Sequence, residues 1–247
     1  NPQEHHYNNI HAVYDAHYFD NTSLTFREKF FYNFMFKGLD LNGKIVADLA
    51  CSSGYNSKFI LDQYPIKKVF GFDISKMACN AYKKNTGSDA YVLDLTIGDY
   101  PYDIKFDVAI IIGGLHHCIV NLQGTFETIE KLLKPNGYLL MVEPNSNCIL
   151  ELVRKIWYKY DGYFESNTER ALDHHKLFSN YGKNFKLLDI KYQGGPAYFI
   201  IYNSLVFRIP LRMKRYIARP LMQLEYLYNK LPGKFLFPYF IARWQLK

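Results

Sequence analysis

Residues 46–57 read VADLACSSGYNS, an apolar strand that contains an acid and runs into a tight turn of small residues. A second apolar stretch, residues 68–72, is followed at once by Asp73. Small residues let a ligand approach the backbone closely, and the helix after such a turn offers its free N–H groups. Asp73 falls where a ribose diol would lie if the two strands are parallel neighbours. The stretch therefore predicts an adenosine-containing cofactor at the carboxyl edge of a parallel sheet.

Three acids indicate which adenosine cofactor this is. A dinucleotide fingerprint aligned on the turn would need glycine at Ser52 and Ser57, so a glycine cradle for a pyrophosphate is missing. Asp48 would repel a pyrophosphate, but it can accept hydrogen bonds from an ammonium group. Asp94, which ends a third strand, can accept from an adenine amino group. The three acids favour S-adenosylmethionine, and an NAD-dependent oxidoreductase is the disfavoured alternative.

At this point the chain resembles the class I S-adenosylmethionine-dependent methyltransferases, within them the small-molecule branch labelled methyltransferase type 11. The likeness covers roughly residues 40–145 and rests on the order of 46–54, 71–75, 92–95, 106–118 and 132–145. The family's first motif, acid-x-Gly-x-Gly-x-Gly, falls on Asp48, Ala50, Ser52 and Gly54, so two glycines are replaced by other small residues. The resemblance implies an α/β, Rossmann-like, doubly wound sheet of seven strands, mostly parallel with an antiparallel final strand.

The cofactor-binding residues are predicted from the strand ends and the resemblance together. In such enzymes an N-terminal segment, here residues 1–37 and helical from about Thr25, covers the cofactor as a lid. Tyr14 and Tyr18 are spaced to share a helix face, and Arg27 can pair with the methionyl carboxylate; aromatic packing and a surface salt bridge are the alternatives. The expected contacts are Asp48, Ala50, Cys51, Ser52, Gly54, Asp73, Ile74, Asp94, Leu95, Ile112, Gly113, Tyr14 and Arg27.

Histidines at the end of the fourth strand are the candidate catalytic residues. The strand at 106–112 runs into Gly-Gly-Leu and then His116 and His117, beside the expected position of the methyl group. Either imidazole can act as a general base near neutral pH, and the resemblance ranks His117 above His116. The alternative is that one of them caps a helix or packs under the lid. Further candidates for acceptor contact at this edge are Glu143, Asn145, His174 and His175.

Motifs of other methyltransferase subclasses are missing. The end of the fourth strand lacks the Asn/Asp-Pro-Pro-aromatic tetrad of amino-methylating nucleic-acid enzymes and the Pro-Cys pair of cytosine-C5 enzymes. It also lacks carboxylates for a hard divalent cation, so we expect no metal and no nucleic-acid acceptor. The predicted reaction is methyl transfer to oxygen or nitrogen of a small, anionic or amphiphilic molecule such as a sugar, a nucleotide-linked sugar, a lipid or a secondary metabolite. A catalytically silent cofactor-binding partner subunit is the alternative.

Length and composition predict one domain over residues 1–247, with a lid at 1–37, a cofactor-binding core at 38–145 and an acceptor-side cover at 146–247. The net charge of +7 is modest, and its simplest interpretation is solubility. The four cysteines are scattered singly, and neither a signal peptide nor an apolar membrane-spanning stretch is evident. We therefore expect a cytoplasmic protein with reduced thiols; the sequence does not indicate an oligomeric state.

Alternating patterns predict the elements of the sheet. Residues 194–238 form an expected helical insertion before the last strand, aromatic at first and basic from Arg208 onward. We expect it to bury its aromatic face, to solvate its charges and to line the acceptor pocket; contact with a membrane surface is the alternative. Strands are expected at 44–49, 68–72, 90–93, 106–112, 138–143, 185–192 and 239–246, and helices at 56–63, 76–84 and 121–133, the last ending at Lys-Pro-Asn-Gly, residues 134–137.

Overall fold

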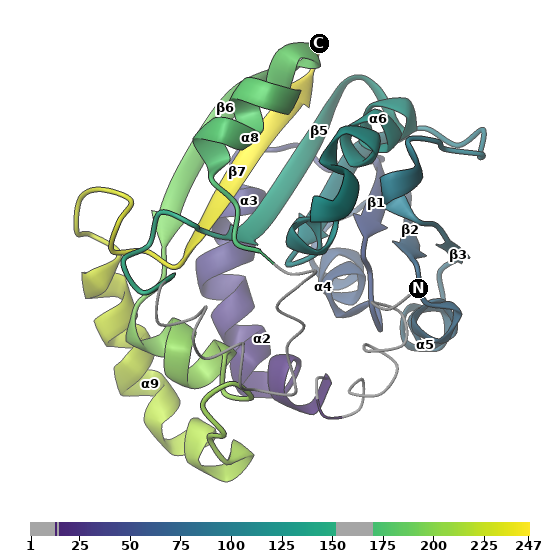
Figure 1. The fold of residues 1–247 in the computed structure, drawn as a ribbon. Helices are drawn as coiled ribbons and strands as arrows, with labels where there is room; N and C mark the ends of the chain where they lie inside the picture. Colours follow the sequence, from purple (N-terminus) through teal and green to yellow (C-terminus); the bar gives the residue numbers. More distant parts are fainter. Residues whose placement is uncertain (1–12, 14, 152–169) are drawn as a thin grey trace.

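A seven-stranded mixed sheet organises the molecule in the computed structural model, which describes residues 13, 15–151 and 170–247 (Figure 1). The strand order is β3-β2-β1-β4-β5-β7-β6. Strands β1 to β5 run parallel, whereas β7 is antiparallel to both of its neighbours, β5 and β6. The strands are β1 Ile45–Leu49, β2 Lys68–Asp73, β3 Ala90–Val92, β4 Phe106–Ile112, β5 Leu133–Pro144, β6 Phe185–Gln193 and β7 Tyr239–Leu246.

Helices cover both faces of this sheet and bury its apolar side chains. On one face α6 and α8 pack through residues such as Phe126 and Leu177, and on the other α2, α4 and α9 pack through Phe26, Ile60 and Met222. Central strands that are covered on both sides read as continuous apolar runs, as β4 does. The helices are α2 Asn21–Arg27, α3 Asn33–Met35, α4 Tyr55–Gln63, α5 Lys76–Thr86, α6 Leu122–Leu132, α8 His174–Tyr181 and α9 Leu211–Tyr228, with π-helical turns at Glu28–Tyr32 and Tyr198–Tyr202.

The predicted fold class is confirmed, and the differences lie at element boundaries. The N-terminal segment is already helical at residues 15–18. Helix α2 then begins at Asn21 and not near Thr25, because the Asp20 side chain accepts hydrogen bonds from the first free amides of α2. Helix α6 ends at Leu132, directly before the predicted stop signal at residues 134–137. Strand β5 begins at once with Leu133, so it includes these residues. Pairing with β4 joins Phe106 to Leu133 and Val108 to Tyr138, so residues 134–137 form an irregularity within the strand.

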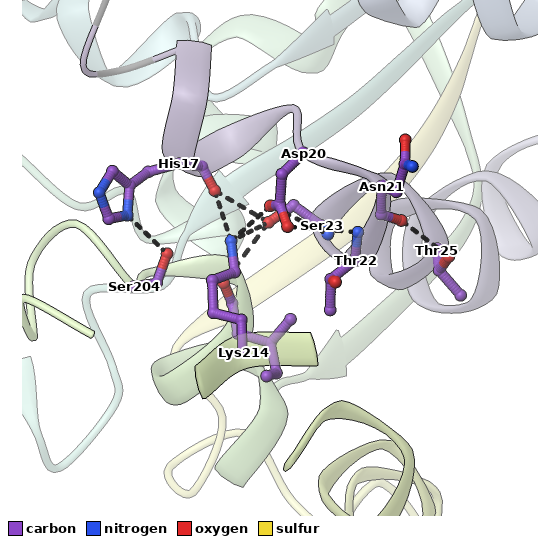
Figure 2. A network of polar contacts seen from close by, with 9 residues as sticks. His17, Asp20, Asn21, Thr22, Ser23, Thr25, Ser204 and Lys214 are labelled. Carbon is purple, nitrogen blue, oxygen red and sulfur yellow. Dashed lines mark hydrogen bonds and ion pairs between the residues drawn. The ribbon is translucent and has the colours of Figure 1, made fainter. Parts of the chain in front are cut away.

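A buried lysine ties the insertion to the N-terminal segment (Figure 2). Lys214 projects from α9, and its fully buried ammonium donates to the carbonyl oxygen of His17 at 2.7 Å and to Oδ1 of Asp20 at 2.5 Å. A third bond runs to Ser23 Oγ at 2.7 Å. His17 Nδ1 in turn lies 3.0 Å from Ser204 Oγ. The sequence indicated a solvated charge at Lys214, whereas the structure buries it between two distant segments.

Among the described residues, none of the helices combines the length and the apolar character needed to cross a bilayer.

Replacing Lys214 with Met should destabilise the protein by about 2–4 kcal/mol, because Asp20 and the His17 carbonyl would lose a charged donor in a largely buried place. The free energy of unfolding in urea measures this loss. Lys84→Met, at an exposed position on α5, is the matched control and should change stability by less than about 0.5 kcal/mol. Equal stability of both variants would contradict a structural role for Lys214.

Candidate cofactor and catalytic site

The turn after β1 keeps a left-handed backbone although two of its residues are not glycine. Ala50 has φ 51° and Ser52 has φ 49°, and Gly54 follows with φ 82° at the start of α4. The left-handed region costs an L-residue roughly 1–2 kcal/mol, so small side chains here still carry strain. The two positions where the glycine motif is replaced therefore retain the conformation that glycine usually supplies.

Asp73, at the end of β2, holds this turn in place. Its Oδ2 accepts the backbone N–H of Ser52 at 3.0 Å, and its Oδ1 accepts that of Ser75 at 2.9 Å. The side chain is partly exposed at the carboxyl edge of the sheet. A carboxylate offers about four lone-pair sites, so hydroxyl groups of a ligand can bond to it in addition to these amides.

Asp48, on β1, is fully buried beneath the same turn. Its Oδ2 accepts a hydrogen bond from Ser57 Oγ at 2.8 Å. Burial raises the pKa of Asp48 to about 7, although the Ser57 bond and the nearby charge of Arg27 favour its ionised form. The residue is thus placed within the turn rather than on its exposed side, and its predicted contact with an ammonium group stays a prediction.

The remaining predicted cofactor contacts lie along the same edge. Asp94 caps the short helix after β3, accepting from the amide and hydroxyl of Thr96 at 2.9 and 2.7 Å. Gly113 has φ 68°, and a Cβ built on it would meet just one atom of the described chain, His116 Cε1 at 3.9 Å. Of the other predicted contacts, Ile74 and Ile112 are partly exposed, whereas Leu95 and Cys51 are buried.

The N-terminal segment lies against the turn, and its predicted role as a lid over the cofactor stays a prediction. Ser53 Oγ donates to Asp15 Oδ2 at 2.5 Å, and the ring of Phe19 stacks on Tyr55 with centroids 4.4 Å apart. Tyr14 lies outside the described residues.

Arg27 belongs to the same contact between the N-terminal segment and α4. It is buried, lies over the ring of Phe19 and donates to Asn56 Oδ1 at 2.9 Å and to the hydroxyl of Tyr202 at 3.2 Å. Its predicted pairing with a carboxylate of the cofactor is untested.

The loop after β4 is organised by one buried carboxylate, Glu143 on β5. Its Oε1 accepts the amides of Gly114 at 3.0 Å and Leu115 at 2.8 Å. Its Oε2 accepts the amide of His116 at 3.2 Å and lies 2.8 Å from the ring nitrogen Nδ1 of the same residue. Burial raises the pKa of Glu143 to about 7, and the loop amides and His117 oppose this rise. Glu143 therefore contacts both the amide and the ring of His116, and its predicted contact with an acceptor stays a prediction.

The two histidines lie side by side on this loop. Their ring centroids are 4.1 Å apart, and both side chains are partly exposed. His116 carries the close contact to Glu143. A carboxylate that receives Nδ1–H fixes the tautomer and leaves Nε2 as the basic nitrogen. The geometry thus gives His116 the orienting group of a general base, whereas the family resemblance ranks His117 first.

The other acceptor candidates lie in different surroundings. Asn145 uses its amide group to bind the loop before β7, donating to the carbonyl oxygens of Lys234 and Phe237 at 2.8 Å each. His174 is buried, and its Nε2 accepts the indole N–H of Trp244 at 3.1 Å. Burial lowers the pKa of His174 to about 4. His175 is exposed on α8. Contact between these three residues and an acceptor remains a prediction.

Several residues at the site were missed by the sequence analysis. Asn56 and Ser57 open α4, where they bond to Arg27 and Asp48, and Tyr82 donates to Ser57 Oγ at 2.7 Å. Small polar residues directly after the turn were a usable signal for the first two. Tyr82 gave none, because it lies on α5 whereas its partner Ser57 lies on α4, and the two helices become neighbours only in the folded protein.

Comparisons with known proteins agree with this geometry. Residues 47–139 match the methyltransferase domain family. An uncharacterized methyltransferase of Schizosaccharomyces pombe is 32% identical over 114 residues, which cover 41% of this chain and 39% of the yeast protein. The chain thus spans well under half the length of that relative.

Solved structures share the fold at low sequence identity. A methyltransferase of Anabaena variabilis that depends on S-adenosylmethionine matches with a TM-score of 0.60 at 17% identity, over 99% of this chain and 93% of its own. The N-methyltransferase NodS of Bradyrhizobium japonicum, solved with S-adenosyl-L-homocysteine, matches with a TM-score of 0.56 at 9% identity, over 92% and 89%.

Substitutions at Ser52 should report the left-handed backbone of the turn. Ser52→Gly should leave the free energy of unfolding unchanged or raise it by up to about 1 kcal/mol, because relief of strain offsets the greater freedom of the unfolded chain. Ser52→Val should lower it by about 1–3 kcal/mol, since a branched side chain tolerates positive φ least. Thermal and urea unfolding measure both effects. A valine variant as stable as the glycine variant would contradict the assigned conformation.

Proposed function

We propose that the chain is a class I S-adenosylmethionine-dependent methyltransferase that transfers a methyl group to an oxygen or nitrogen atom of a small molecule. The match of residues 47–139 to the methyltransferase domain family supports this proposal. The observation that carries the transfer step is the 2.8 Å contact between Glu143 Oε2 and His116 Nδ1. It joins a buried carboxylate to an imidazole on the loop that follows β4. This is the arrangement of a general base and its orienting group.

The residues at the carboxyl edge fit the cofactor. Asp73 and Asp94 present partly exposed carboxylates at the ends of neighbouring strands, where ribose hydroxyls and an adenine amino group can donate to them. Gly113 leaves open space where any other residue would place a side chain. S-adenosylmethionine, when bound, supplies a methyl group already activated by its sulfonium charge.

The protein has two tasks in this reaction. The first is to hold the acceptor close to the methyl group and in line with it, because orientation alone contributes a large part of such a rate. The second, for a hydroxyl acceptor, is to take its proton. Glu143 acts here as a positioning residue, since it fixes the His116 ring and stabilises the charge that the ring gains with the proton. An amine acceptor needs less help, because its neutral form is already nucleophilic.

The class of acceptor is inferred from the cover over this edge. The insertion before β7 brings an aromatic cluster around Tyr198, Tyr202 and Tyr239, with ring centroids 4.7 to 5.6 Å apart for its contacting pairs. The lid adds Tyr18, whose ring meets Tyr202 edge-on. Most of these rings are buried in the core between the lid and the insertion, and a cover packed in this way favours a small acceptor with an apolar part over a polymer. A cofactor-binding subunit without turnover is the competing possibility, and an acceptor panel separates the two.

His116→Ala should lower turnover by about 10²–10⁴-fold and leave cofactor affinity within about twofold, because a general base acts in the transition state. The assay follows methyl transfer to a panel of sugars, nucleotide sugars, lipids and phenols. Wild-type turnover should rise with pH, and the variant should lose that dependence. Glu143→Gln should lower the maximal rate more than it changes the Michaelis constant.

His117→Ala is the matched control for the adjacent imidazole and should retain most of the turnover. A large loss in His117→Ala with turnover retained in His116→Ala would make His117 the base. Wild-type turnover in both variants would mean that neither histidine takes the proton, and positioning alone would remain.

Asp73→Asn should weaken binding of S-adenosylhomocysteine by roughly 1.5–3 kcal/mol, the range for hydrogen bonds to a charged group. Isothermal titration calorimetry measures the affinity, with NAD as a second ligand that should not bind. Asp189→Asn, an exposed substitution on β6, is the control and should bind as the wild type does. Unchanged affinity in a folded Asp73 variant would remove this residue from the site, and tighter binding of NAD would argue for an oxidoreductase.

A further inference from the structure

Helix α9 lies at the periphery of the molecule (Figure 1). Several of its apolar side chains are exposed and form a stripe along the helix. The positions recur every three or four residues, so they lie on one side of the helix. Tyr216 is 81% exposed and Leu227 is 61% exposed, values far above those of ordinary partly packed side chains. The stripe consists of Met213, Tyr216, Pro220, Leu224 and Leu227.

The stripe continues into the loop after the helix. Leu231 and Leu236 are exposed, and Phe235 is 62% exposed. This loop is held in place rather than loose, since the hydroxyl of Tyr228 donates to the Leu236 carbonyl at 3.0 Å. The Asn145 amide group binds the same loop from β5. We call α9 and residues 230–236 together the α9 face.

Basic residues flank this apolar stripe without acidic neighbours along the chain. Arg212, Arg215 and Arg219 precede members of the stripe by one residue each and are exposed, so they form a second row beside it. Arg208 and Lys230 extend the positive charge at the two ends. Between residues 207 and 236 the sequence contains a single acid, Glu225.

That acid lies on the opposite side of the helix. Glu225 is buried and accepts the backbone amides of Gly195 at 2.8 Å and Ala197 at 2.9 Å. Lys214, on the same inward side, binds the N-terminal segment. These two anchors fix the rotation of α9 about its axis. The expectation that the insertion solvates its charges therefore differs from the structure at Lys214 and Glu225, which are buried. Its aromatic part is buried as expected, for example at Tyr202, whereas the apolar row of α9 is exposed.

We propose that the α9 face binds the surface of a bilayer that contains anionic lipids, with α9 parallel to the membrane plane. Apolar side chains beside a row of bases suit the boundary between acyl chains and phosphate headgroups. Each base near such a surface adds to the attraction, and the absence of exposed acids along this segment matches a uniformly negative partner. A folded protein partner or a second copy of the chain could also bind the apolar row. Protein surfaces usually carry charges of both signs, however, so such a partner would not explain why this segment exposes bases and no acids.

This position relates the face to the candidate site. The insertion leaves the sheet after Gln193 and returns at Tyr239, which pairs with Pro144 at the carboxyl end of β5. Glu143 precedes Pro144, so the loop that carries His116 lies at the same edge as the insertion. On the basis of the proposed function, an acceptor at the bilayer surface would approach the site from the α9 face.

Co-sedimentation with vesicles tests the proposal without any methyl transfer. The protein should partition onto vesicles of phosphatidylcholine mixed with phosphatidylglycerol much more strongly than onto phosphatidylcholine alone, and added salt should weaken the difference. The variant Arg212→Ser, Arg215→Ser, Arg219→Ser should partition on the order of 100-fold less, since each surface base contributes about a fivefold effect. Met213→Ser, Tyr216→Ser, Leu224→Ser and Leu227→Ser in one chain should also abolish binding.

The matched control removes three exposed bases elsewhere: Lys67→Ser, Lys84→Ser and Lys186→Ser. It should bind vesicles nearly as the wild type does. Vesicle binding is compared only among variants whose melting temperature equals that of the wild type, and if the apolar variant is less stable, the arginine variant alone decides. Failure of the wild type to bind, equal binding to neutral vesicles, or an equal loss in the control would overturn the proposal.

Other occupants of the face give distinct results, each against the proposal. Self-association in analytical ultracentrifugation that disappears in the apolar variant, together with absent vesicle binding, would identify a dimer interface. Binding of duplex RNA without vesicle binding would identify a nucleic-acid surface. Loss of methyl transfer in the His116 variant with vesicle binding intact bears on the proposed function alone, so the two proposals can fail independently.

Discussion

The candidate site depends on a buried carboxylate that collects the amides of a loop. Glu143 accepts the N–H groups of Gly114, Leu115 and His116, and these groups would otherwise end β4 without partners. The loop cannot move toward or away from the sheet without breaking several charge-assisted bonds at once. This anchor also sets the distance between the loop and the turn after β1. The two approach so closely that a Cβ on Gly114 would collide with Ala50, and the histidines are therefore held beside that turn.

A carboxylate that accepts several loop amides recurs at two other places in the described part of the chain. Asp73 collects the amides of Ser52 and Ser75, and Glu225 collects those of Gly195, Ala197 and Tyr198. Burial raises the pKa of both Glu143 and Glu225 to about 7, because desolvation disfavours the ionised form of a carboxylate. The cost of desolvation is offset because the backbone N–H groups of these irregular loops have no neighbouring strand to bond to. Each carboxylate accepts the hydrogen bonds that a neighbouring strand would otherwise accept.

The lid and the insertion act as one cover because their polar contacts cross between them. Lys214 binds the N-terminal segment near Asp20, and Arg27 reaches Tyr202 of the insertion from the other direction. Two cations thus lie in the interface between segments far apart in the sequence. This arrangement leaves the apolar row and the arginines on the outer side of α9, where the proposed membrane contact would form.

The sequence by itself determined the succession of strands and helices along the chain, the turn after β1 and the acids at the strand ends. Apolar periodicity and small turn residues are local signals, so β4 and β7 were predicted with the bounds that they have. The sequence could not determine which side chains from distant segments contact one another. His116 and Glu143 are separated by a helix and a strand, and only the parallel pairing of β4 with β5 brings them to 2.8 Å. The same holds for Lys214, whose charge pattern indicates solvent until the N-terminal segment folds over it. Secondary structure depends largely on neighbouring residues and can therefore be predicted from the sequence. The burial and pairing of charges depend on which distant segments pack together, and only the tertiary structure decides that.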